Sequence, residues 1–289
     1  MRNLDATFLV YDGPIARAYL ALLRHRGIEP QRIVLMVSGR RRSTGKIVAR
    51  WLPNALRQEI AERYQETESN YWSRQIAKTY PELYDAIVRI CAEAFGVPAG
   101  LYEAILAPAR YDGMAPRVDR VLVDDGLSDP GLVDALRQDS AQAVVFTGGG
   151  IVPASLLNGT GRKFIHVHPG FLPPVRGADG LLWSILTRGR PGASCFYLAP
   201  GLDVGDIILA REYNPILFPS VGRNIDDLTL YRAIFAFVDP IIRAVTLVDA
   251  VRGNSDPASL PARVQQGPSE TYNFMHDELR SVVLRRLFA

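Results

Sequence analysis

Two of the four histidines of this chain stand one residue apart, at His166 and His168 in the segment KFIHVHPG. Side chains two residues apart on a β-strand project from the same face, so both rings would enter one pocket at the end of this strand. Asp203 and Asp206 follow in the turn PGLDVGD, an exposed loop of the kind that can carry a carboxylate into a cleft. An imidazole and a carboxylate that meet in a cleft can act as a general acid and base.

The same side chains are compatible with two other roles. Two imidazoles and a carboxylate form a set of metal ligands that leaves one coordination position open for water, so a metal-dependent hydrolase is one alternative. A packed histidine that only hydrogen-bonds its neighbours is the other, and it is the usual role of any single histidine. The histidines therefore mark a candidate site whose chemistry needs further evidence.

Two glycine-containing segments lack the spacing of nucleotide-binding motifs. The segment SGRRRSTGKIV fails as a P-loop, because five residues separate its glycines and Ile47 follows the lysine. We interpret it as a basic, solvated loop, with contact to an anionic ligand as the alternative. Gly148 to Gly150 follow the apolar segment AQAVVF without the spacing of a dinucleotide-binding motif. Glycines at the end of a buried strand leave main-chain groups uncovered, so a flat ligand could lie against them.

Composition limits the class of protein. The chain has 289 residues, of which 48% are hydrophobic, and this is enough for a sizeable core. Its net charge is +3 with basic residues spread along the chain, which does not indicate nucleic-acid binding. Two cysteines are too few for a disulfide framework, and no segment has the about 18 apolar residues of a membrane span. We therefore expect a cytoplasmic protein with no membrane association.

Short β-rich segments alternate with helical patterns, which predicts an α/β fold with a mostly parallel sheet. The segments 141–147 and 163–168 are apolar runs that turn residues end, so we expect them to be adjacent, parallel strands at the centre of this sheet. A block at about 40–116 has aromatic residues at helical spacing and predicts a helical insertion. We expect an α/β domain over residues 1–215 and a helical extension over 216–289.

The segment from Phe164 to Glu212 resembles the core of the 10-formyltetrahydrofolate-dependent formyltransferases. This family includes methionyl-tRNA, glycinamide ribonucleotide and nucleotide-sugar N-formyltransferases. Its pattern is Asn-x-His-x-Ser-Leu-Leu-Pro, then Arg-Gly-Ala, then Leu-Asp-x-Gly, and this chain has HVHPGFLP, RGA and LDVG in that order. The resemblance extends over roughly residues 117–272 and does not include the block 40–116. It implies a Rossmann-like sheet and an enzyme that transfers formyl groups.

The resemblance also implies residue roles. It places His168 at the catalytic His of the family and Asp203 at the catalytic Asp, while His166 takes the position of the Asn. In the family an acceptor amine attacks the formyl carbon, the Asn and His steady the oxyanion, and the Asp helps to move the proton. One such oxyanion donor is worth about 3 to 4 kcal/mol. An imidazole can donate a hydrogen bond, so we expect His166 to replace the amide, and Gly170 in place of the Ser to widen the pocket.

The cofactor implied by the resemblance is 10-formyltetrahydrofolate, with its pterin held largely by main-chain groups. The residues expected to bind it lie in two loops: Gly148, Gly149, Gly150, Ile151 and Val152 in the first, and Pro200, Gly201 and Leu202 in the second. No metal is expected in this site. The alternatives are a metal-dependent hydrolase built on the His-x-His pair, and a formyltransferase-like module that binds its ligand without catalysis.

The expected acceptor is the amine of a small molecule, such as an amino sugar on a nucleotide, a hydroxylated ornithine or a peptide-like amine. The tRNA enzymes of the family carry a β-rich C-terminal barrel, whereas only a short helical segment follows Tyr272, so a tRNA acceptor is not expected. The helical insertion and the C-terminal tail are expected to shape the acceptor pocket. His25 and His276 are assigned to helix packing, with acceptor binding or a homodimer contact as the alternative for His276.

Overall fold

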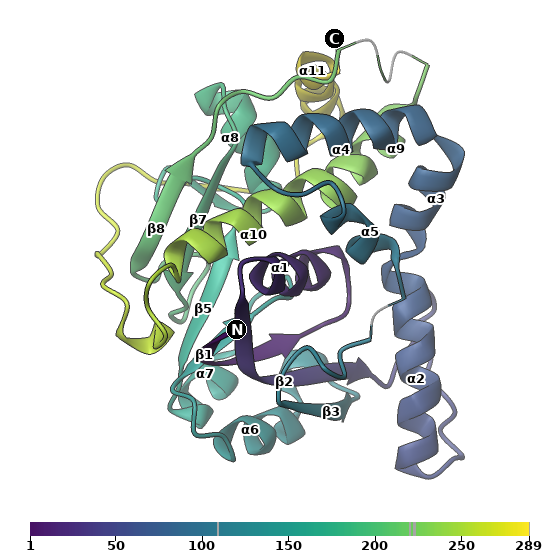
Figure 1. The fold of residues 1–289 in the computed structure, drawn as a ribbon, viewed down its shortest axis with the longest axis vertical. Coiled ribbons are helices and arrows are strands. Elements are labelled where there is room, and N and C mark those ends of the chain that lie inside the picture. The colour runs from purple at the N-terminus through teal and green to yellow at the C-terminus, as the bar shows by residue number, and fades with distance from the viewer. Residues whose placement is uncertain (109, 220, 222–223, 289) are drawn as a thin grey trace.

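The computed structural model of the protein describes residues 1–108, 110–219, 221 and 224–288. Within these residues a seven-stranded sheet has the order β3-β2-β1-β4-β5-β7-β8 (Figure 1). Its parallel strands are β1 (Arg2–Val10), β2 (Ile28–Ser38), β3 (Arg117–Val123), β4 (Ala143–Phe146) and β5 (Lys163–His168). The last two strands, β7 (Gly192–Tyr197) and β8 (Ile207–Glu212), are antiparallel. The predicted α/β fold with a mostly parallel sheet is confirmed.

Strands β4 and β5 are adjacent and parallel at the centre of the sheet, as predicted, with Val144 opposite Phe164. All four residues of β4 are buried, as expected of a strand covered on both faces. β1 pairs with β2 on one side and with β4 on the other, so the strand order reverses between β1 and β4. In open α/β sheets, ligands bind at the carboxyl ends of the strands beside such a reversal.

Helices cover both faces of the sheet (Figure 1). On one face α1 (Pro14–His25) packs against α10 (Asp239–Ala250). On the other face α6 (Pro130–Arg137) and α7 (Ala154–Thr160) form a second apolar cluster, in which Leu132 and Leu156 are fully buried. Pro14 suits the first turn of α1 because its missing N–H would have no partner there. Helix α1 therefore begins directly after β1, at the reversal of the strand order.

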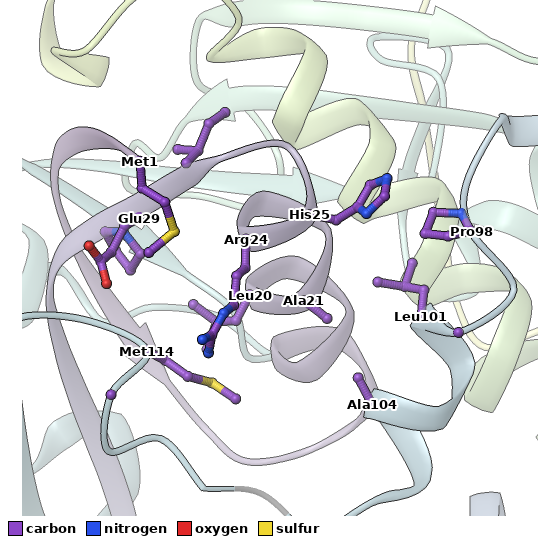
Figure 2. A pocket seen from close by; sticks show the side chains of 14 residues that line it. Met1, Leu20, Ala21, Arg24, His25, Glu29, Pro98, Leu101, Ala104 and Met114 are labelled. Carbon is purple, nitrogen blue, oxygen red and sulfur yellow. The ribbon is translucent and has the colours of Figure 1, made fainter.

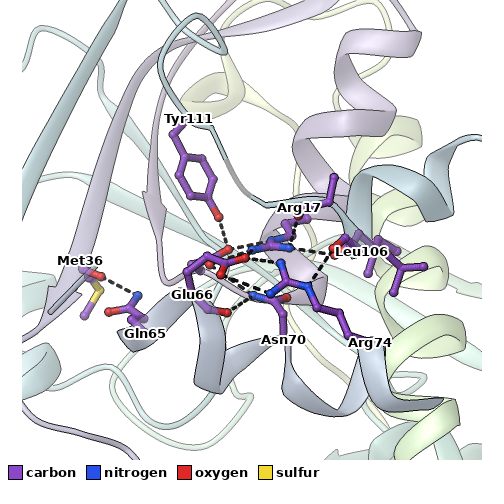
Figure 3. A network of polar contacts seen from close by, with 11 residues as sticks. Arg17, Met36, Gln65, Glu66, Asn70, Arg74, Leu106 and Tyr111 are labelled. Atoms are coloured by element: carbon purple, nitrogen blue, oxygen red, sulfur yellow. Dashed lines mark hydrogen bonds and ion pairs between the residues drawn. The ribbon is translucent and has the colours of Figure 1, made fainter. Parts of the chain in front are cut away.

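The helical insertion lies between β2 and β3. In the described part of the chain it comprises α2 (Asn54–Ser69), α3 (Tyr71–Thr79), α4 (Pro81–Phe95) and α5 (Leu101–Leu106). A polar network joins it to the sheet (Figure 3). Gln65 on α2 donates to the carbonyl oxygen of Met36 on β2 at 2.9 Å, and its own carbonyl accepts from Ser38 N at 2.7 Å. The insertion is thereby held against the carboxyl end of β2.

A second part of this network is ionic, with Arg17 and Asp12 buried and Glu66 and Arg74 partly exposed. Arg17 on α1 pairs with Asp12 at 2.9 Å and with Glu66 on α2 at 3.0 Å. Asp12 also accepts from Tyr111 Oη at 2.6 Å, and Glu66 pairs with Arg74 on α3 (Figure 3). Removing one partner of a buried ion pair costs about 3 to 5 kcal/mol. These charges therefore fix the insertion beside the turn that follows β1.

The C-terminal region packs onto the rest of the chain at two places. Helix α9 (Asp227–Ala233) continues through a π-helical turn (Ile234–Val238) into α10 on the sheet. Further on, β9 (Glu270–Tyr272) pairs in parallel with β6 (Val175–Gly177), and α11 (Asp277–Leu287) packs near α8 (Gly180–Arg188). Single 3-10 turns occur at Gly126–Ser128 and Pro257–Ser259. None of the described helices is long and apolar enough to cross a lipid bilayer.

Candidate active site

His166 and His168 both lie near the carboxyl end of β5, as the sequence predicts, but their surroundings differ. His168 is buried with 3% of its surface exposed, whereas His166 is half-buried and lines a cavity. Asp203 approaches from the turn between β7 and β8, and its Oδ2 lies 3.4 Å from His168 Nδ1. Asp206, the second carboxylate of that turn, is exposed. The imidazole and the carboxylate that meet are therefore those of His168 and Asp203.

The three-residue strand β6 holds both members of this pair. His168 Nε2 donates to the carbonyl oxygen of Val175 at 3.0 Å, and the amide of Gly177 donates to Asp203 Oδ2 at 2.9 Å. Asp203 itself has a left-handed backbone with φ of 55°, which a non-glycine residue adopts only when its surroundings hold it there. The side-chain amide of Gln265 does so, because it donates to the main-chain oxygen of Asp203 at 2.8 Å.

The hydrogen bonds of His168 define where its protons lie. A carbonyl oxygen can only accept, so Nε2 carries a hydrogen toward Val175. Nδ1 then faces a carboxylate, and the two atoms attract only when a proton lies between them. Burial lowers the pKa of His168 from its ordinary value, while the negative charge of Asp203 opposes this change. The pair is therefore a place where one proton can be held or released.

Two glycines make room for the His168 ring. A β-carbon on Gly170 would lie 2.4 Å from His168 Nε2, and one on Gly180 would lie 2.7 Å from the same atom. Both distances are shorter than any tolerated contact, so these positions require glycine while the ring has this orientation. The expectation that Gly170 widens the pocket is wrong. The space that a side chain at position 170 would fill is already occupied by the His168 imidazole.

His166 is oriented by the neighbouring strand. Its Nδ1 lies 3.1 Å from the carbonyl oxygen of Phe146 at the end of β4, and its ring lies beside the rings of Phe146 and Phe196. Burial, and next the positive charge of Arg243, lower the pKa of His166 to about 4. Arg243 is itself held behind β5, where it donates to the carbonyl oxygen of Val167 at 2.9 Å. His166 is therefore neutral at neutral pH.

A small cavity of about 30 Å³ connects these groups with the predicted cofactor loops. His166 and Asp203 line it together with five of the eight residues predicted to bind the cofactor: Gly150, Ile151, Val152, Gly201 and Leu202. His168 is not among its lining residues, since it lies buried behind Asp203. Pro200 is exposed and lines neither this cavity nor its larger neighbour.

The larger neighbour is a cavity of about 510 Å³ at the reversal of the strand order. Gly148 and Gly149 line it, and Phe146 lines both cavities, so the two are adjacent. The other walls come from the turn Tyr11–Ala16 after β1, from Arg42 in the basic loop and from Ser69 at the end of α2. Sequence analysis missed Tyr11 to Ala16 and Ser69 as site residues. Gly13 and Pro14, which directly follow the β-rich segment 6–11, were the signal that could have found the first of these segments.

A third hollow of about 480 Å³ lies at the opposite end of α1 (Figure 2). It is mostly apolar, with Leu20, Leu101 and Met114 in its wall and Arg24 beside them. None of the predicted site residues contributes to it. His25 also lines it and is exposed, so the assignment of His25 to helix packing is wrong.

His276 is exposed and forms an ion pair with Glu278, so its assignment to helix packing is wrong as well.

The structure also bears on the alternative of a metal-dependent hydrolase. The described residues contain no group of three or more His, Cys, Asp or Glu side chains that could hold a metal ion. His166 Nδ1 and His168 Nε2 are each directed at a main-chain carbonyl, so each ring keeps only one nitrogen that could bind a metal. This arrangement does not support the metal-dependent hydrolase.

Known proteins share sequence with this chain. A methionyl-tRNA formyltransferase from Syntrophus aciditrophicus (strain SB) is 30% identical over 162 residues, which cover 55% of this chain and 50% of the relative. The cytosolic 10-formyltetrahydrofolate dehydrogenase of Homo sapiens is 31% identical over 81 residues, which cover 24% of this chain and 9% of that protein. The chain thus spans half or less of the length of these curated relatives.

Among solved structures, a sugar N-formyltransferase from Shewanella sp FDAARGOS_354 aligns with 99% of this chain and 88% of its own, with 11% identity and a TM-score of 0.47. The family model described as formyl transferase matches residues 55–218. This match begins within α2, so it covers the helices of the insertion, to which the resemblance did not extend. Because more than half of the chain is matched, the protein belongs to the formyl transferase family, as the resemblance predicted.

Proposed function

We propose that this protein transfers a formyl group from 10-formyltetrahydrofolate to the amine of a small acceptor. The observation that carries the proposal is the His168–Asp203 pair, which lies beside two adjoining cavities at the carboxyl ends of the central strands. A proton-carrying pair beside two cavities suits a reaction between two bound molecules, in which one nitrogen gains the formyl group and another loses it.

The residues around the smaller cavity fit a pterin ring. Among the hydrogen bonds of the described residues, none involves the main-chain N–H or C=O groups of residues 148–152, so these groups are free to pair with a ligand. Ile151 and Leu202 are 65% and 39% exposed at the same cavity, and their apolar side chains can flank a flat ring. When bound there, the cofactor supplies the formyl group.

The smaller cavity must enlarge before a pterin can enter. A volume of about 30 Å³ is far below the roughly 300 to 1,000 Å³ of ligand pockets. Gly148 to Gly150 precede the exposed Ile151, and glycines allow the backbone to change direction at little cost. We therefore expect the loop of residues 148–152 to move outward when the cofactor binds.

The larger cavity is the proposed acceptor site. It adjoins the smaller one through Phe146, so an amine in it can reach a formyl group held beside Asp203. In the transfer a bond forms between the acceptor nitrogen and the formyl carbon, and the bond from that carbon to the cofactor nitrogen breaks. One proton leaves the acceptor nitrogen and one reaches the cofactor nitrogen. His168 positions Asp203, which lines the cavity in which these protons move.

Arg42 at the larger cavity favours an acceptor with an anionic group, such as an amino sugar linked to a nucleotide. Methionyl-tRNA is the second candidate, because several curated relatives are methionyl-tRNA formyltransferases. The cytoplasmic location, the domain boundary near residue 215 and a homodimer stay predictions.

The test is a screen of acceptors with 10-formyltetrahydrofolate. Nucleotide-linked amino sugars, ornithine-like amines, peptide amines and methionyl-tRNA are each incubated with the protein, and the formylated product is identified by mass spectrometry. A non-reactive folate analogue should also raise the melting temperature. At a hundred times its Kd, binding stabilises the folded state by about 2.7 kcal/mol. If no amine is formylated, no formyl group is released to water and no folate shifts the melting temperature, the proposal fails.

A further inference from the structure

We propose that His166 accepts the proton of the attacking amine, and does not donate a hydrogen bond to the formyl oxygen as the family Asn would. This inference rests on the proposed function and assigns one catalytic role within it. The position that holds an amide donor in the resembled pattern would then hold a base, so the residue exchange changes the chemistry of the site.

The hydrogen bond of His166 determines its tautomer. Nδ1 lies 3.1 Å from the carbonyl oxygen of Phe146, which can only accept, so Nδ1 carries the hydrogen. A neutral imidazole has a single N–H, and Nε2 is therefore left with a lone pair. Phe146 belongs to β4, and the pairing of β4 with β1 and β5 holds its carbonyl in place. A neutral His166 can thus accept a hydrogen bond at its second nitrogen but cannot donate one there.

The charges around His166 keep it neutral between turnovers. Arg243 on α10 faces it from behind β5, His168 lies on its own strand, and Asp203 lies across the cavity. Arg243 is held in this position, because it forms an ion pair with the fully buried Asp239 at 3.0 Å and donates a hydrogen bond to the carbonyl oxygen of Val167. Burial and Arg243 disfavour the protonated ring, while Asp203 favours it. A ring in this position takes up a proton only briefly and returns it readily.

His166 is also the imidazole that can reach the reacting atoms. It lines the small cavity, whereas His168 is buried and directs its two nitrogens to Val175 and Asp203. As the acceptor nitrogen bonds to the formyl carbon it becomes acidic, and its proton passes to His166 Nε2. The same proton then passes to the cofactor nitrogen as its bond to the formyl carbon breaks. No proton is gained or lost by the enzyme over the cycle.

The tautomer can be measured without any substrate. In ¹⁵N-histidine-labelled protein, the His166 resonances are identified by their loss in His166→Asn. At pH 7 we expect a protonated Nδ1 and an unprotonated Nε2. A protonated Nε2, or a fully protonated ring at this pH, would overturn the proposal.

Kinetics test the role itself, with the acceptor found by the screen or with formyl release to water. We expect His166→Asn to lower kcat by about a hundredfold, the size of a lost general base, with little change in KM for the cofactor. If His166 were an oxyanion donor, the amide would keep or raise the rate, and this result would refute the inference. His276→Asn, at an exposed histidine away from both cavities, serves as the control and should leave kcat unchanged.

Chemical rescue separates a base from a donor more directly. His166→Ala leaves space beside the small cavity, and added imidazole should restore part of the rate. Between pH 6 and 8 the rescue should follow the concentration of neutral imidazole; a rescue that follows imidazolium would contradict the proposal. A wild-type protein that formylates nothing would remove the proposed function, whereas an active wild type with a fully active His166→Asn would remove only this inference.

Discussion

Gly177 lies so close to Tyr272 that a β-carbon on it would be 2.1 Å from the carbonyl oxygen of that tyrosine. The contact joins β6 to β9, and β6 is the strand that bonds both His168 and Asp203. The position of the pair thus depends on a C-terminal segment that is remote in sequence. A small displacement of β6 would disturb the hydrogen bond from His168 to Val175 and the one from Gly177 to Asp203.

Gly177→Ala should disturb this contact and the site together. Its φ of 91° and the clash with Tyr272 both oppose a side chain, so we expect a loss of about 1 to 3 kcal/mol in the free energy of unfolding. Formyl transfer should fall at least tenfold. Gly189→Ala is the matched control, because φ is 73° there but nothing lies within 4 Å of the added carbon. Equal loss of activity in both variants would mean that the β6–β9 contact does not position the pair.

Asp203→Asn tests the pair with a side chain of nearly the same shape. We expect at least a hundredfold loss of kcat, because the amide cannot hold the proton shared with His168. The pKa of His168 should fall further, since the charge that opposes its lowering is removed. Kinetics and histidine NMR measure the two effects. Asp206→Asn, in the exposed carboxylate of the same turn, should leave both unchanged.

Much of the central sheet and the His168–Asp203 pair could be predicted from the sequence, for identifiable reasons. β4 is apolar over its whole length, which is the pattern of a buried parallel strand, and β5 adds Phe164, Ile165 and Val167 between its polar residues. Asp203 lies in a Gly-flanked turn at the spacing of a known pattern. Both features are local, so they can be read without knowing how distant segments pack.

The features that were missed depend on contacts between distant segments. Strand β6 has three residues and exists because β9 pairs with it. The nitrogen of His166 that carries the hydrogen is determined by the carbonyl of Phe146, on a different strand. The sequence pattern alone does not show this contact and suggested a donor. The turn after β1 lines a cavity together with Ser69 of α2 and Phe146 of β4, which are distant from it in the sequence.

The low pKa of His166 predicts how stability depends on pH. The folded-state pKa is about 4 and the ordinary value is 6.5, so the unfolded chain binds more protons between these pH values. Stability should therefore fall as pH is lowered from 6.5 toward 4, by on the order of 3 kcal/mol from this residue. Urea titrations of wild type and His166→Asn across this range provide the measurement. Parallel curves for the two proteins would show that His166 protonates as readily in the folded state.

Glu66→Gln tests whether the insertion is held by its partly buried ion pairs. Glu66 pairs with Arg17 and Arg74, and these two partners lower its pKa although burial acts in the opposite direction. Its contribution to stability is therefore present above its ordinary pKa of 4.5 and is lost as pH falls below that value. At pH 7 the neutral amide would leave Arg17 and Arg74 with less compensation, and because Glu66 is partly exposed we expect a loss of about 1 to 3 kcal/mol in the free energy of unfolding.

Glu59→Gln is the matched control for this change, because Glu59 is on the same helix and pairs with Arg63 at the surface, where the two side chains are 61% and 78% exposed. An exposed pair of this kind contributes at most about 1 kcal/mol. We further expect Glu66→Gln to raise KM for the acceptor more than KM for the cofactor, since α2 carries Ser69 into the larger cavity and contributes no residue to the smaller one. A variant as stable as Glu59→Gln, with both KM values unchanged, would show that the insertion is positioned by its apolar contacts alone.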